Sequence, residues 1–142
     1  MMLGIVPARG SSKGIPQKNL QMLDGKPLVL LALDKLSQVS EITRLVCSTD
    51  DDEIAAICGL HGYEVHRRPP VEDTQTIGEM AIQVVNDLCW PGQVGVFQPT
   101  SPCLRPETIS AAIAEFDRGD WDSLVSVVED RHILWDEHSV LV

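Results

Sequence analysis

The sequence predicts an α/β fold, with a mostly parallel sheet and helices on both of its faces. Short apolar runs typical of buried strands alternate along the chain with segments whose apolar residues recur at helical spacing. Such alternation favours parallel strands joined by helical crossovers. The length of 142 residues corresponds to about one domain, and 44% hydrophobic and 23% charged residues are typical of a soluble globular protein.

The expected strands are short apolar stretches that end at turn or loop residues. The first stops at Pro7, and Pro69 and Pro70 prevent the third from continuing as a central strand. We expect strands over residues 3–6, 45–47, 63–66, 94–97 and 123–128, and an apparent strand over residues 139–142.

The expected helices are marked by periodicity and by end signals. Pro27 suits the first helical position, Asp50 with Glu53 three residues later resembles a capping box, and Gly62 is a good helix stop. Helices are therefore expected from Pro27, over residues 51–61, from Ile77 to Leu88 and over residues 106–117.

Composition limits the classes of function. The chain lacks an apolar run long enough to cross a bilayer, a signal peptide and a C-x-x-C pair, which favours a cytoplasmic protein with reduced cysteines and no membrane contact. The net charge of −10 argues against nucleic acid as a partner. Residues 1–30 nevertheless hold four basic residues against one acidic residue, which suggests a compact anionic ligand.

Unusual residues are concentrated in the loops expected at the carboxyl edge of the sheet, where α/β folds bind ligands. These loops are residues 7–19, 48–50, 67–76 and 98–105. Residues 7–19 combine Gly and Ser with the cations Arg9, Lys13 and Lys18 and contain no acidic residue, which suits phosphate binding. The segment matches neither the Walker A pattern nor G-x-G-x-x-G, and a solvated surface turn remains the alternative.

Residues 8–19, ARGSSKGIPQKN, resemble the signature ARGGSKGIPxKN of the CMP-N-acylneuraminate synthetases, or N-acylneuraminate cytidylyltransferases. Further segments agree in the family's order: STD at 48–50, VHRR at 65–68, QPTSPCL at 98–104 and DSLVSVV at 122–128. The resemblance implies a three-layer Rossmann-like nucleotide-diphospho-sugar transferase fold. Residues 1–142 would form the nucleotide-binding portion of a single domain whose C-terminal part is missing.

The resemblance also implies an activity, in which the anomeric hydroxyl of a sialic acid attacks the α-phosphate of CTP to give CMP-sialic acid and pyrophosphate. Mg²⁺ would be the cofactor, with its ligands beyond residue 142, and the full-length protein would be a homo-oligomer. The alternatives are the same chemistry on legionaminic, pseudaminic or Kdo-type sugar acids, or a CTP-binding fragment without catalysis.

Site residues are carried over by position. Arg9 and Lys13 match the phosphate-loop cations, which implies the catalytic role of holding the CTP phosphates. Ser11 stands where the family usually has a second glycine. The expected substrate-binding residues are Lys18, Asn19 at the nucleotide, Arg68 at the cytidine end, Thr76 in place of a family serine, and Gln98 as a buried amide at the sugar side. The acidic run at residues 50–53 is interpreted as helix-capping carboxylates and not as metal ligands.

Overall fold

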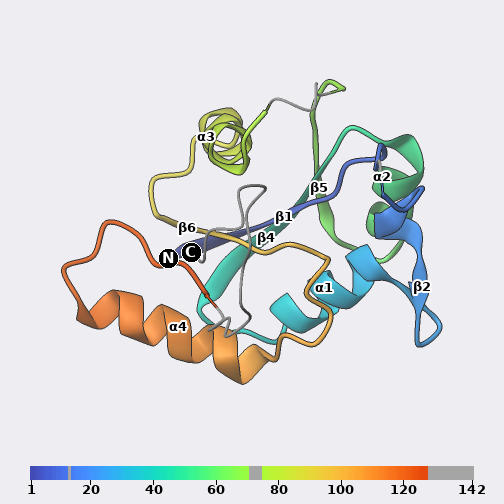
Figure 1. The fold of residues 1–142 in the computed structure, drawn as a ribbon. Coiled ribbons are helices and arrows are strands. Elements are labelled where there is room, and N and C mark those ends of the chain that lie inside the picture. The colour runs from blue at the N-terminus through green and yellow to red at the C-terminus, as the bar shows by residue number, and fades with distance from the viewer. Residues whose placement is uncertain (13, 71–74, 128–142) are drawn as a thin grey trace, which may run out of the picture.

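The computed structural model describes residues 1–12, 14–70 and 75–127. Its main sheet has four parallel strands, β1 (Met2–Pro7), β4 (Ile42–Thr49), β5 (Glu64–Arg67) and β6 (Gln93–Val96). Their order across the sheet is β5-β4-β1-β6, so the chain moves outward from β1 and then returns to its other side (Figure 1). That reversal creates a switch point between β1 and β6, the position where open α/β sheets bind ligands.

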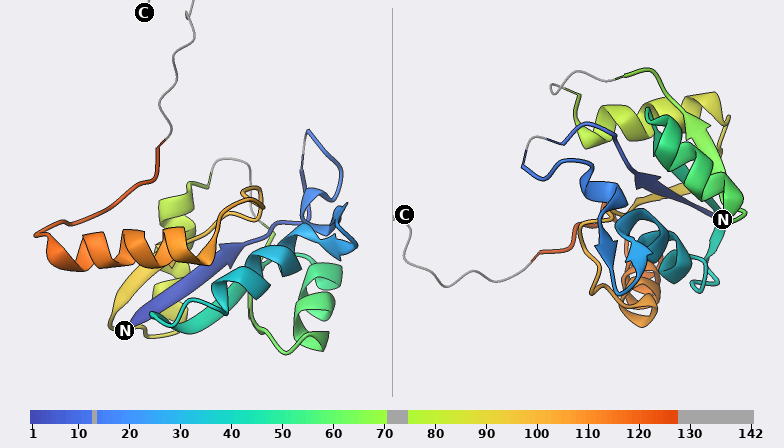
Figure 2. Two further views of the ribbon diagram at one scale, coloured as in Figure 1. Left: turned by 90° about the horizontal axis from the view of Figure 1, so that it is seen from below. Right: turned by 90° about the vertical axis from the view of Figure 1, so that its right-hand side faces the viewer.

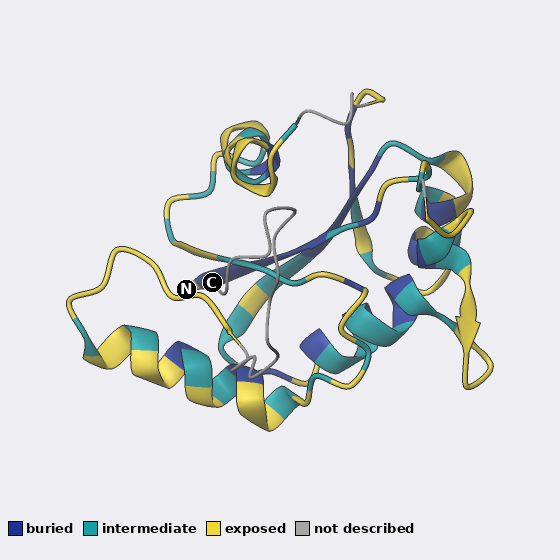
Figure 3. Ribbon diagram, viewed as in Figure 1, coloured by how far each residue is buried: buried dark blue, intermediate teal, exposed yellow. Residues whose placement is uncertain are grey.

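Helices cover both faces of the sheet, as the sequence predicts. Figures 1 and 2 show α3 (Ile77–Asp87) on one face, with α1 (Leu28–Leu36) and α4 (Pro106–Arg118) on the other. One apolar core contains buried residues of α1, α4 and α2 (Asp52–Leu60), and a second core contains buried residues of α3. Strand β1 contributes alternate side chains to the two cores and is buried along most of its length (Figure 3).

A two-stranded hairpin precedes α1, at a position where the sequence predicts the start of the helix. It consists of β2 (Met22–Leu23) and β3 (Lys26–Pro27), which pair in antiparallel fashion and follow a 3-10 helix, η1 (Lys18–Leu20). Asp24 and Gly25 form its turn with φ values of 52° and 75°, and Asp-Gly favours such a left-handed turn. Pro27 is therefore the residue before α1 and not its first helical residue.

The N-terminus of α2 also differs from the prediction. Asp51 caps this helix by accepting a hydrogen bond from the backbone N–H of Ile54 at 2.9 Å. The expected capping box of Asp50 and Glu53 is wrong, because the helix begins one residue later and Asp50 faces the first loop. Gly62, with a φ of 80°, follows the end of α2 as predicted.

The strand expected over residues 123–128 is absent from the part that the structure describes, residues 123–127. Val125 and Val127 are 77% and 90% exposed there. An apolar β-branched pattern favours a strand, but a strand also requires a neighbour to complete its hydrogen-bond ladder. The apparent strand at residues 139–142 lies outside the described residues. None of the helices in the described ranges could span a bilayer.

Candidate functional site

A cleft of about 310 Å³ opens at the carboxyl edge of the sheet. Its walls come from the loops that follow β1, β5 and β6 and from the N-terminal turns of α3. Three of the four loops that the sequence places at this edge therefore converge on one cavity. The cleft lies at the switch point between β1 and β6, as the parallel topology requires.

The structure brings nearly all predicted site residues to this cleft. The lining includes Arg9, Lys18, Asn19, Arg68, Thr76 and Gln98. Lys13, the remaining predicted residue, lies outside the described residues. The placement agrees with the prediction that Arg68 and Gln98 open on the same edge of the sheet, whereas the contacts that each residue makes with a ligand stay predictions.

The first loop, residues 7–19, is fixed to its surroundings at several points. The backbone N–H of Ala8 donates to the carbonyl oxygen of Ser48 at 2.9 Å, which extends the ladder between β1 and β4 by one bond. The buried amide of Asn19 donates from Nδ2 to the carbonyl oxygen of Arg9 at 2.9 Å. Asn19 therefore braces the loop that carries Arg9, in addition to lining the cleft.

Gly10 occupies a position that admits no side chain. A Cβ atom at Gly10 would lie 2.3 Å from Oδ2 and 2.8 Å from Cβ of Asp51. Its backbone N–H donates to Oδ1 of Asp50 at 3.0 Å. The glycine therefore allows the first loop to approach the end of β4 closely.

Arg68 is the most deeply buried cation of the site, with 8% of the residue exposed. Its Nη1 donates to Oε1 of Gln75 at a long 3.4 Å, and its buried Nε has no hydrogen-bond partner among the described residues. Burial lowers the pKa of the Arg68 guanidinium, the charge of Arg9 lowers it further, and the charge of Asp50 acts in the opposite direction. Arg68 thus keeps a buried N–H that no described residue accepts, which is an exception among buried polar groups.

Thr76 and Gln98 have environments that the sequence does not predict. Thr76 is the N-cap of α3, and its hydroxyl accepts from the backbone N–H of Glu79 at 3.2 Å and donates to Oε2 of Glu79 at 2.9 Å. Gln98 is exposed at the cleft and not buried as expected, because it follows β6, which is an edge strand of the sheet within the described residues. Its Oε1 accepts a long hydrogen bond from the Thr100 hydroxyl at 3.5 Å.

Two residues near the site were missed by sequence reasoning. Asp50 was expected in a loop at the carboxyl edge of the sheet, but it was interpreted only as a helix cap, and its hydrogen bond with the first loop was not predicted. Gln75 lines the cleft and contacts both Arg68 and Gln83, and no motif marks it in the sequence.

The described lining of the cleft does not fit a magnesium ion. Mg²⁺ is held in proteins mainly by carboxylates and water, and the lining residues in the described ranges include no Asp or Glu. Asp51 caps α2, and Asp52 pairs with Arg67 at 2.5 Å. Within residues 1–12, 14–70 and 75–127, no group of three potential ligand side chains could hold a metal.

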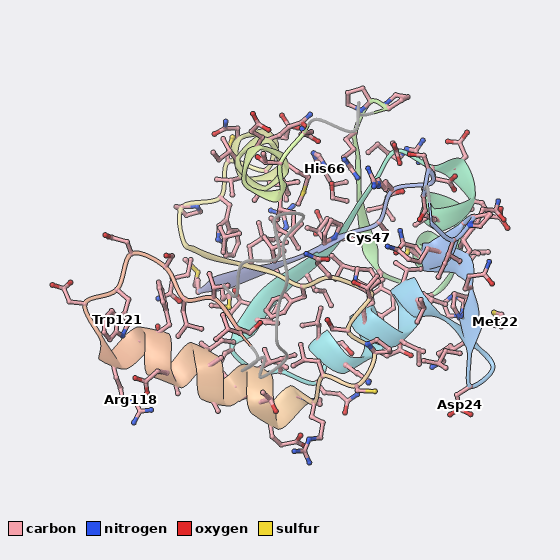
Figure 4. The ribbon with its side chains drawn as sticks, in the orientation of Figure 1. Met22, Asp24, Cys47, His66, Arg118 and Trp121 are labelled. Carbon is pink, nitrogen blue, oxygen red and sulfur yellow. The ribbon has the colours of Figure 1, made fainter. Side chains whose placement is uncertain are left out.

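A polar relay behind the site ties α3 to the sheet. The Ser48 hydroxyl lies 3.2 Å from Nδ1 of His66, and Nε2 of His66 lies 2.9 Å from Oδ2 of Asp87 at the end of α3. Figure 4 labels His66, which belongs to β5. The order Ser-His-Asp resembles a nucleophilic triad, but Ser48 is fully buried and out of reach of a substrate. The relay therefore positions α3, whose other end lines the cleft.

Comparison with known proteins gives consistent results. The family model described as cytidylyltransferase matches residues 3–142. An N-acylneuraminate cytidylyltransferase A of Danio rerio is 33% identical over 94% of this chain, and a CMP-N,N'-diacetyllegionaminic acid synthase of Legionella pneumophila is 36% identical over 89%. The chain spans 31% of the length of the Danio protein and 57% of the Legionella protein.

Solved structures support the fold. A CMP-2-keto-3-deoxy-manno-octonic acid synthetase complexed with CTP superposes with a TM-score of 0.70 at 18% identity, covering 82% of this chain and 47% of that one. A 4-diphosphocytidyl-2C-methyl-D-erythritol synthase of Anaerococcus prevotii gives a TM-score of 0.66 at 16% identity, covering 99% of this chain and 62% of that one. At these identities the likeness establishes a Rossmann-like nucleotidyltransferase fold and nothing about substrates.

Proposed function

Since the chain belongs to the cytidylyltransferase family, we propose that it forms the nucleotide-binding part of an enzyme that activates a sialic acid with CTP. The anomeric hydroxyl of the sugar acid attacks the α-phosphate of CTP, CMP-sialic acid forms and pyrophosphate leaves. The signature at residues 8–19 and the resemblance to the Danio enzyme support this choice of sugar.

The observation that carries the proposal is the convergence of Arg9, Lys18 and Arg68 on a single cleft whose described lining contains no carboxylate. Three cations would repel one another in an empty site, and an anionic ligand removes that repulsion. The phosphates of CTP match this demand in charge. Donors from guanidinium groups form charge-assisted hydrogen bonds with phosphate oxygens, often two at a time.

In this proposal the residues of the chain act by positioning and by charge neutralisation. Arg9 and Lys13 hold the triphosphate, and Arg68 holds the cytidine end through donors that its burial keeps away from bulk water. Gln98 meets the sugar acid at the exposed side of the cleft, where its amide both donates and accepts hydrogen bonds. Fixing both reactants in one orientation lowers the barrier without a covalent intermediate.

The proposal also includes a cellular compartment, an oligomeric state and a cofactor. We place the reaction in the cytoplasm, in a homo-oligomer that requires no nucleic acid or membrane. Mg²⁺ is proposed as the cofactor, with ligands outside residues 1–142 as the family resemblance implies; the described lining of the cleft supplies no carboxylate. Binding of CTP by the present cleft is accordingly expected to persist when EDTA replaces Mg²⁺.

A second sugar has a specific observation in its favour. The Legionella protein named as a diacetyllegionaminic acid synthase is 36% identical to this chain, at least as similar as the Danio enzyme. Legionaminic acid shares the nine-carbon acid skeleton of sialic acid. A substrate panel therefore needs both acids.

The test combines binding with turnover. Calorimetry should show that the chain binds CTP and discriminates against UTP, and release of pyrophosphate should require CTP, Mg²⁺ and a nine-carbon sugar acid together. CTP binding without turnover identifies a nucleotide-binding module that lacks catalytic parts. Absence of CTP binding in a folded chain refutes both the enzyme and the nucleotide-binding module.

A further inference from the structure

Asp50 connects two parts of the site that come from different strands. Its Oδ1 accepts the backbone N–H of Gly10 at 3.0 Å, across 40 residues of sequence. Asp50 directly follows β4, and the neighbouring strand β5 leads into Arg68, whose backbone N–H donates to the Thr49 carbonyl oxygen at 3.1 Å. The carboxylate therefore holds the first loop at the end of β4, next to the strand that leads into Arg68.

The charge of Asp50 has a second effect. It favours the protonated form of Arg68, whereas Arg9 disfavours it. Without a ligand, Asp50 therefore offsets part of the repulsion between the two arginines. The same negative charge opposes the approach of a phosphate, because like charges repel over the short distances of one cleft.

We propose that Asp50 is a positioning residue of this site: its carboxylate holds the first loop through Gly10 and serves as a standing counter-charge to Arg68 until an anionic ligand binds. This inference rests on the proposed function, since it assumes that the ligand is CTP. The hydrogen bond aids binding by fixing the loop, and the charge works against binding while stabilising the empty site.

Two substitutions separate these effects. Asp50→Asn removes the charge and keeps an oxygen that can accept from Gly10, whereas Asp50→Ala removes both. The control is Asp52→Asn, an equal change of charge two residues away, at a side chain that is 98% exposed and pairs with Arg67 at the surface. Affinities for CTP and for inorganic tripolyphosphate are measured by calorimetry, and melting temperatures without ligand by circular dichroism.

We expect Asp50→Asn to bind CTP at least as tightly as the original chain, with a gain that fades as salt rises. Asp50→Ala should bind about fivefold or more weakly than Asp50→Asn, because the Gly10 N–H loses its partner. Both should melt at a lower temperature without ligand, and Asp52→Asn should match the original chain. A purely structural role of Asp50 would lower the melting temperatures of Asp50→Asn and Asp50→Ala but leave these two variants with the same affinity for CTP.

Equal affinities of the Asn and Ala variants would overturn the positioning role. Weaker binding by Asp50→Asn than by the original chain, or the same gain in Asp52→Asn, would overturn the counter-charge. If the original chain binds tripolyphosphate but not CTP, the proposed nucleotide function fails, and the comparison of variants on tripolyphosphate still decides the role of Asp50. If it binds neither, both proposals are refuted.

Discussion

Replacing Arg68 by Met is expected to weaken CTP binding while leaving the stability of the ligand-free chain unchanged or raised. Methionine fills a similar volume and removes a buried charge whose Nε has no partner among the described residues. Burying a charge without a direct ion pair is costly, and Arg68 has no ion pair among the described residues, so methionine removes that cost. Asp50 keeps its hydrogen bond from the Gly10 N–H and is not left without a partner. Among the residues that the structure describes, the one side-chain hydrogen bond lost is the long one from Arg68 to Gln75, at 3.4 Å.

The loss of affinity follows from the bonds that Arg68 would make to CTP. A hydrogen bond to a charged group contributes about 1.5–3 kcal/mol, which corresponds to roughly 10- to 150-fold in the dissociation constant. Arg68→Lys keeps the charge but lacks the planar fork of donors. Its affinity for CTP should therefore lie between that of the original chain and that of Arg68→Met. Calorimetry with CTP and thermal melts without ligand measure the two quantities.

The neighbouring residue supplies the control. Arg67→Met removes a half-exposed arginine that pairs with Asp52 and donates to the Asp51 carbonyl oxygen at 2.6 Å, away from the cleft lining. It should leave CTP affinity unchanged. If Arg68→Met binds CTP as well as the original chain, or if it is strongly destabilised with its affinity intact, Arg68 is a structural residue and the reasoning is wrong.

Further expectations concern other parts of the chain. Lys13→Ala should weaken CTP binding by about 1–3 kcal/mol in calorimetry; unchanged affinity would remove Lys13 from the phosphate site. Gln98→Ala, assayed in a form that turns over, should raise the KM for the sugar acid more than the KM for CTP, and the reverse pattern would contradict its place at the sugar side. Burial and a hydrogen bond to Asp34 raise the pKa of Tyr63 to about 12 from 10.0. Because the folded-state pKa is raised, this contact stabilises the fold below pH 10 and is lost as the pH rises toward 12. The free energy of unfolding should therefore fall more steeply over that range than in Tyr63→Phe, and identical slopes would exclude the contact as the cause.

The sheet and the location of the cleft could be predicted because both depend on local patterns. Apolar runs gave the four parallel strands to within a few residues, and parallel strands necessarily bring their carboxyl ends to one edge. Arg68 and Gln98 each follow such a strand, so their meeting in one cleft required no knowledge of tertiary contacts. The hairpin could also have been predicted, since Asp24-Gly25 is a strong turn signal. It was missed because Pro27 was interpreted as the start of a helix.

The remaining features depend on contacts between distant residues. Asp50 and Asp51 are chemically identical neighbours, and only the approach of Gly10 decides that one holds the loop while the other caps α2. The exposure of Gln98 depends on β6 being an edge strand among the described residues, and strand order is not a local property of the sequence. A strand over residues 123–127 would need a partner that the local pattern does not specify.

Backbone register connects these observations. Each loop that lines the cleft leaves its strand with one further hydrogen bond to a neighbouring strand. The donors and acceptors are Ala8 to Ser48 at 2.9 Å, Arg68 to Thr49 at 3.1 Å and Phe97 to Ile5 at 2.9 Å. These bonds are set by strands packed between two apolar cores and not by the polar side chains of the cleft. Substitutions of those side chains should therefore alter affinity without changing where the loops begin, which is why binding and stability can be separated at Arg68 and Asp50.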